Sequence, residues 1–89
     1  MEVKIINYLK GNKGYGITIS EIGGNEKVLK KMCYKHNENL NKIEILGKNE
    51  FLEMDKYIIY LSDINDIDED ITNMTIFTKD GEIIIENWD

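Results

Sequence analysis

Residues 74–88 read MTIFTKDGEIIIENW, and this stretch decides the fold class. Met74–Thr78 and Glu82–Trp88 are short runs rich in Ile on either side of a turn signal, which is typical of two paired strands. The Asp80-Gly81 pair between them favours a type I′ turn, whose twist matches that of paired antiparallel strands. We therefore predict a β-hairpin. Its second strand directs Ile83 and Ile85 to one face and Glu82, Ile84, Glu86 and Trp88 to the other.

The rest of the chain carries similar signals, namely Ile-rich runs separated by Gly, Asn and Asp. These runs predict strands at Val3–Leu9, Tyr15–Ile22, Lys42–Leu46 and Phe51–Leu61, the first two joined by a turn at 11–14. One helix is predicted after Gly23-Gly24-Asn25, because Val28, Leu29, Met32, Cys33 and His36 recur at helical spacing. The expected fold is α+β, a mainly antiparallel sheet of about five to six strands with one helix packed on one face. The expected order is ββαββ, acidic insert, ββ.

Length and composition indicate one domain over residues 1–89, because a chain of 89 residues has too little apolar surface for a second core. The N-terminal sequence MEVKIINYLKGNKG has no apolar run of signal-peptide length, and no stretch is apolar enough to span a membrane. The single Cys excludes an internal disulfide framework. A soluble cytoplasmic protein is expected.

Charge is divided unevenly along the chain. Residues 1–49 hold nine Lys and five acids, whereas residues 50–89 hold twelve acids and two Lys, which gives the net charge of −6. Acids are densest in an insert over residues 62–70. The chain contains no Arg, and Lys cannot reproduce the bidentate contacts of Arg with phosphate, so direct nucleic-acid binding is not expected. An acidic surface instead attracts basic proteins.

Two motifs in the sequence resemble parts of chemical sites. Asp66-x-Asp68-x-Asp70 matches the start of a calcium loop, but Ile71 and Phe77 stand where that loop needs Gly and Glu. Cys33 and His36 would share a helical face, yet they are the only Cys and the only His, too few for a zinc site or a catalytic dyad with its supporting groups. No enzyme activity, metal or cofactor is expected.

The favoured function is a small acidic inhibitor that docks on a basic protein and blocks its active or nucleic-acid-binding site. In size and composition the chain resembles toxin-neutralising immunity proteins and phage anti-defence inhibitors such as anti-CRISPR proteins. The alternatives are a protein that self-assembles through an edge strand, for example as a homodimer, and a protein that sequesters a small ligand. Two simpler readings also stand, in which the acids serve solubility and Trp88 covers an edge of the core. The predicted partner-binding residues are Asp63, Asp66, Asp68, Glu69, Asp70, Glu82, Glu86 and Trp88.

Overall fold

The computed structural model describes residues 2–88, which form one helix, a seven-stranded sheet and a short 3-10 turn. The radius of gyration is 12.0 Å, as expected for a compact chain of this length. The elements in chain order are α1 (Glu2–Gly11), β1 (Ile17–Glu21), β2 (Glu26–Asn37), β3 (Lys42–Lys48), β4 (Met54–Tyr60), η1 (Leu61–Asp63), β5 (Ile64–Glu69), β6 (Asn73–Thr78) and β7 (Gly81–Asn87).

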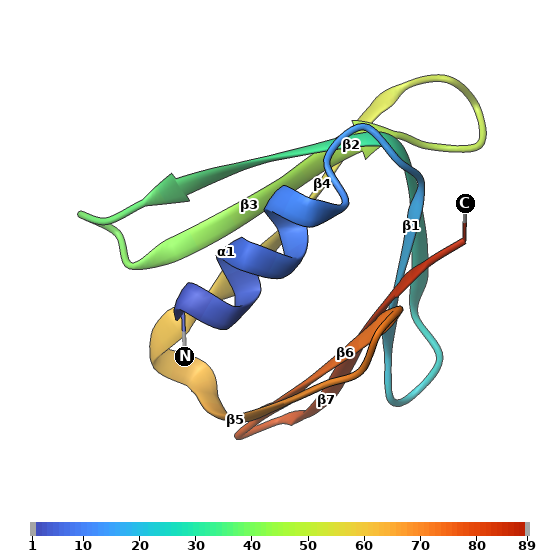
Figure 1. Cartoon of the computed structure of the whole chain (residues 1–89). Coiled ribbons are helices and arrows are strands. Elements are labelled where there is room, and N and C mark those ends of the chain that lie inside the picture. Colours follow the sequence, from blue (N-terminus) through green and yellow to red (C-terminus); the bar gives the residue numbers. More distant parts are fainter. Residues whose placement is uncertain (1, 89) are drawn as a thin grey trace.

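The strands form one antiparallel sheet in the order β4-β3-β2-β1-β7-β6-β5. The sheet is folded into two arms, β2-β3-β4 and β5-β6-β7, joined by β1 and the first half of β2, and α1 lies between them (Figure 1). The side of the sheet that faces α1 is called the inner side here. The fully buried side chains come from this side and from α1, and they include Ile5, Leu9, Ile17, Met32, Ile45 and Ile85.

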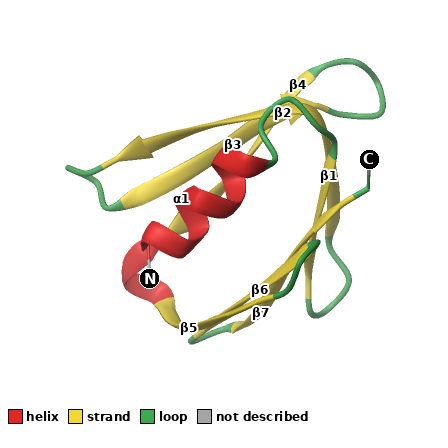
Figure 2. Ribbon diagram, in the orientation of Figure 1, coloured by secondary structure: helices red, strands yellow, loops and turns green. Residues whose placement is uncertain are grey.

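The α+β fold class is confirmed, whereas the number of strands and the position of the helix differ from the prediction. The structure is a mainly antiparallel sheet with one helix, as expected, but it has seven strands where about five to six were predicted. The hairpin at residues 74–88 is confirmed as β6 and β7, but its turn differs from the prediction. Thr78 lies opposite Gly81, so the central turn residues are Lys79 and Asp80 instead of Asp80 and Gly81, and neither has the positive φ of a type I′ turn. The acidic insert contributes η1 and a further strand, β5, at the edge of the sheet (Figure 2).

The predicted first strand, Val3–Leu9, is wrong, because these residues form α1. Ile5, Tyr8 and Leu9 are buried, and their i, i+3, i+4 spacing places them on one face of the helix. The Ile and Val content of this stretch favours a strand, but burial of that apolar face between the two arms stabilises the helix instead.

The predicted helix at Val28–His36 is also wrong, because these residues belong to β2. Lys31 has a positive φ of 51°, and the pairing register of β2 with β3 shifts between Lys30 and Cys33. This β-bulge inserts one residue, so Leu29 and Met32 both face the core although they are three positions apart. A bulged strand therefore reproduces the helical spacing on which the prediction rested.

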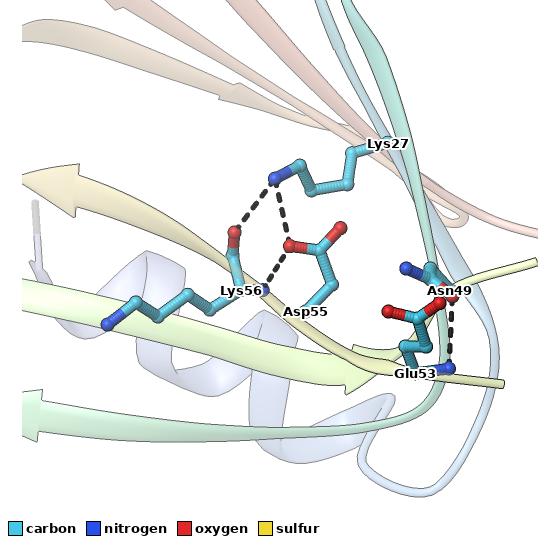
Figure 3. A network of polar contacts seen from close by, with 5 residues as sticks. All are labelled: Lys27, Asn49, Glu53, Asp55 and Lys56. Carbon is cyan, nitrogen blue, oxygen red and sulfur yellow. Dashed lines mark hydrogen bonds and ion pairs between the residues drawn. The ribbon is translucent and has the colours of Figure 1, made fainter. Parts of the chain in front are cut away.

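Polar contacts tie one arm to the strands that join the two arms. Lys27 Nζ lies 3.1 Å from Asp55 Oδ1 and donates a hydrogen bond to the Lys56 carbonyl at 3.0 Å (Figure 3). Nearby, the Tyr57 hydroxyl donates to Glu21 Oε1 at 2.7 Å. These bonds link β4, an edge strand, to β1 and β2 in the middle of the sheet, and so fix how far the sheet curls.

Candidate functional site

The outer side of β5, β6 and β7 brings together acids that are distant in the sequence. On β5 the core-facing Ile67 separates Asp66 and Asp68, so both acids point outward. On β7 the same alternation turns Ile85 inward and directs Glu82 and Glu86 outward. Four of the eight residues predicted for partner binding therefore share one face.

Strand pairing fixes the layout of this face. Phe77 of β6 lies opposite Asp66 on one side and Glu82 on the other. In the neighbouring row Thr75 lies between Asp68 and Ile84. Adjacent strands are about 4.8 Å apart, so backbone positions two strands apart are about 10 Å apart. Asn73, opposite Glu86, also points outward at the start of β6. We call the remaining outward residues of these three strands the acidic face: Asp66, Asp68, Thr75, Phe77, Glu82, Ile84 and Glu86.

The acidic face has an apolar centre and a charged rim. Phe77 and Ile84 are half-buried, and Asp66, Asp68 and Glu86 around them are exposed. Protein interfaces have this composition, with apolar contacts at the centre and polar groups at the solvated edge. Within residues 2–88, no lysine or histidine pairs with any of the four carboxylates of this face.

Three of the predicted residues lie away from the acidic face. Asp63 is in η1, where its Oδ1 lies 3.5 Å from Lys79 Nζ. Asp70 follows β5, and its carboxylate accepts a hydrogen bond from the Ile71 N–H at 2.7 Å. Glu69 pairs with Met74 and lies on the inner side of β5. Its side chain is exposed to solvent there, but it is not part of the acidic face.

Trp88 lies at the end of β7 against Gly16. A Cβ built on Gly16 would lie 2.5 Å from Trp88 Cζ2, so the indole rests directly on the glycine. Trp88 N–H also donates to the Gly16 carbonyl at 3.3 Å, yet the residue is 48% exposed. Trp88 therefore packs on Gly16, just before β1, and still presents a large apolar area to solvent.

The sequence prediction missed Phe77 and Glu26. Phe77 lies two residues before the Lys79-Asp80 turn, so hairpin register could have placed it opposite Glu82. Glu26 extends the acidic face through Ser20, which lies between Ile84 and Glu26 across the strands. No signal pointed to Glu26, because the stretch after Gly23-Gly24-Asn25 is predicted as a helix.

A cleft of about 240 Å³ opens beside Glu82, between the edge strand β4 and the β6–β7 turn. Its walls include two tyrosines and four acids, Tyr57, Tyr60, Glu21, Asp63, Asp80 and Glu82. Tyr57 donates a hydrogen bond from its hydroxyl group to Glu21. Burial is the main cause of the raised pKa of Tyr57, and the contact with Glu21 raises this pKa further. The cleft is therefore negatively charged and has aromatic walls, which suits a cationic group.

Cys33 and His36 do not form a site. On a strand, a separation of three turns two side chains to opposite faces, so Cys33 points outward and His36 inward. His36 Nε2 lies 3.2 Å from Glu2 Oε2 of α1, without a hydrogen bond. In the described part of the chain no three His, Cys, Asp or Glu side chains are grouped to hold a metal ion. Likewise, α1, the one α-helix described, is too short to cross a membrane.

Comparison of the chain with protein-family models, with curated proteins and with solved structures finds no match. The arrangement of side chains on the folded sheet is therefore the basis for a functional assignment.

Proposed function

We propose that this protein is a cytoplasmic binding protein, not an enzyme, that docks its acidic face on a basic protein and blocks that partner's active or nucleic-acid-binding site. Toxin-neutralising immunity proteins and phage anti-defence inhibitors act in this manner. The carboxylates steer a positively charged partner toward the face and speed association. Phe77 and Ile84 then supply the desolvated contacts that slow dissociation.

One observation carries the proposal. Asp66, Asp68, Glu82 and Glu86 come from two strands that are not neighbours, and the sheet gathers them around Phe77 and Ile84 without a cation among residues 2–88 to neutralise them. Carboxylates that serve solubility alone do not need a shared apolar centre. The adjacent cleft adds a negatively charged recess beside Glu82 that would accept a Lys or Arg side chain of the partner.

Self-assembly through an edge strand is the second candidate function, and the edge strands argue against it. β5 carries outward acids and a register shift between Ile64 and Asp66, two features that discourage the addition of another strand. On β4, the other edge, the Lys56 carbonyl accepts a hydrogen bond from Lys27. Sequestration of a small ligand finds its best location in the 240 Å³ cleft, but the charge there restricts it to cations.

The test begins with affinity capture from the native host or its competitors, followed by mass spectrometry of the bound proteins. Binding of the captured basic protein is then measured for the wild type and for an Asp66→Lys/Asp68→Lys variant. We expect the association rate to fall by at least about tenfold in the variant, and the wild-type rate to fall as salt is raised.

The matched control is Glu38→Lys/Glu50→Lys, which makes the same change in net charge at exposed turn positions outside the acidic face. We expect this control to bind nearly as well as the wild type at about 0.15 M salt, where the Debye length is about 8 Å. The proposal fails if both variants lose binding equally, or if Asp66→Lys/Asp68→Lys binds as the wild type does.

A further inference from the structure

The outer side of the other arm carries the opposite charge. Alternation along the second half of β2 and along β3 and β4 directs lysines outward, while Ile43, Ile45 and Ile59 face the core. Pairing places Lys30 opposite Lys48, and Leu46 between Cys33 and Lys56. Asn37, Met54 and Tyr60 also point outward, at the ends of these strands. We call the remaining outward residues of this arm the basic face: Lys30, Cys33, Lys35, Lys42, Glu44, Leu46, Lys48, Lys56 and Ile58.

The basic face has the same plan as the acidic face with the charge reversed. Cys33, Leu46 and Ile58 form a half-buried centre, and five lysines surround it. Glu44 pairs with Lys56 at 3.6 Å. Lys30, Lys35, Lys42 and Lys48 have no carboxylate within ion-pair distance among residues 2–88. Each face therefore presents unpaired charges that the other could neutralise.

The two faces cannot meet within one molecule. They lie on the outer sides of the two arms, and α1 occupies the space between the inner sides (Figure 1). A contact between an acidic face and a basic face must therefore join two copies. After one such contact, the basic face of one copy and the acidic face of the other are still free. Contacts of this kind are head-to-tail and can continue from copy to copy.

We propose that the basic face of one copy docks on the acidic face of a second copy, so that the protein associates head to tail through charge complementarity. This association does not depend on the basic partner proposed above, although the two would compete for the acidic face. The net charge of −6 opposes approach of two copies at long range. Ordinary salt screens that repulsion beyond about 8–10 Å and leaves the close contacts in place, so a reversible, salt-dependent association is expected.

Sedimentation of the purified chain tests the proposal. In about 0.05 M salt the average mass should rise from 10.4 kDa with protein concentration, and in about 0.5 M salt it should return to that of the monomer, because close ionic contacts are then screened. A wild-type chain that stays monomeric in low salt up to about millimolar concentration overturns the proposal. So does an oligomer whose size is unaffected by salt, since this would indicate strand pairing or an apolar contact.

Two neutralising variants separate the faces. The acidic-face variant is Asp66→Asn/Asp68→Asn/Glu82→Gln, and the basic-face variant is Lys35→Gln/Lys42→Gln/Lys48→Gln. Each alone should be monomeric where the wild type associates. A 1:1 mixture should form dimers and nothing larger, because each variant keeps one intact and complementary face. Association of either variant alone, or no dimer in the mixture, contradicts the head-to-tail arrangement.

A lysine control excludes a general effect of charge. Lys4→Gln/Lys10→Gln/Lys13→Gln changes the net charge by the same amount as the basic-face variant, at exposed positions on α1 and the turn after it. This control should associate as the wild type does, and its failure to associate would overturn the assignment to the basic face. The partner-binding proposal is judged separately, because the basic-face variant keeps the acidic face and should still bind the captured partner.

Discussion

Gly16 is the residue on which the position of Trp88 depends. The indole occupies the space that a side chain at residue 16 would fill, with Cζ2 and Cε2 at 2.5 and 2.6 Å from the ideal Cβ position. Real contacts of Cβ atoms are longer than this, so any residue other than glycine displaces the ring. Since Trp88 is the only tryptophan, its fluorescence reports on this single contact.

Gly16→Ala should therefore move Trp88 into solvent. We expect a red shift of the tryptophan emission and a loss of about 1 kcal/mol in the free energy of unfolding, because the half-exposed ring can swing away instead of straining the core. Urea unfolding followed by circular dichroism measures the loss. In a Trp88→Ala background the same substitution should cost almost nothing, and an equal cost in both backgrounds would show that the contact is not the cause.

The strand β2 is the element that shapes the whole sheet. It pairs with β1 through its first half and with β3 through its second half, so it runs from the junction between the arms into one of them. The bulge at Lys31 lies between the two halves, and bulges bend and twist the strand that carries them. Gly47 permits the close approach at this point, because a Cβ there would lie 2.8 Å from Leu29 Cβ and 2.9 Å from the Lys30 carbonyl oxygen.

Deletion of Lys31 should remove the bulge without turning any side chain of β2 to the other face. Lys30 pairs with Lys48 and Cys33 with Leu46, so in the shortened strand Met32 lies opposite Gly47 and still faces the core. The loss of the bend should weaken the packing of the sheet around α1, and urea unfolding followed by circular dichroism should show a cooperative transition at a lower midpoint. The control, Lys31→Gly, suits the positive φ and should keep the midpoint at or near the wild-type value. A deletion variant as stable as the wild type would contradict this role of the bulge.

At the scale of the whole molecule, two tyrosines, the buried Tyr8 and the half-buried Tyr57, connect elements that are far apart in the sequence. Tyr8 of α1 donates to the Thr72 carbonyl at 2.7 Å and approaches the Ile85 carbonyl at 3.3 Å, which ties the helix to the arm of β6 and β7. Tyr57 joins β4 to Glu21 of β1. Burial, with smaller effects of Glu86 and Glu69, raises the pKa of Tyr8 to about 12, and burial with Glu21 raises that of Tyr57.

These pKa values predict a loss of stability in alkali. In the unfolded chain both tyrosines ionise near pH 10, whereas in the folded protein Tyr8 stays protonated to about pH 12. A raised folded pKa therefore adds stability below pH 10 that is lost as the pH rises from about 10 to 12. Urea unfolding across this range should show the decline. Tyr8→Phe should lower stability at pH 7 by about 1–2 kcal/mol and make the alkaline decline shallower, and an unchanged slope would contradict the assignment.

The sequence by itself determined the antiparallel class, the hairpin at residues 74–88 and the outward direction of Glu82 and Glu86. These features follow from the short Ile-rich runs and from the turn signal in Lys79-Asp80-Gly81, which act over a few residues, although the turn itself lies one residue earlier than predicted. Local patterns also misled, because the Ile-rich start of the chain favours a strand and the bulged β2 imitates a helix. Only packing between the arms and the register shift at Lys31 distinguish those cases.

The tertiary structure alone decided which charges lie together. Pairing of β5 with β6, and of β6 with β7, placed Asp66 and Asp68 beside Glu82 and Glu86 and sent Asp63, Glu69 and Asp70 elsewhere. The fold also converted the uneven charge of the two halves of the sequence into oppositely charged outer faces on the two arms. Long-range strand order is the physical reason, because it depends on how the whole sheet closes around α1, and no short stretch of sequence encodes it.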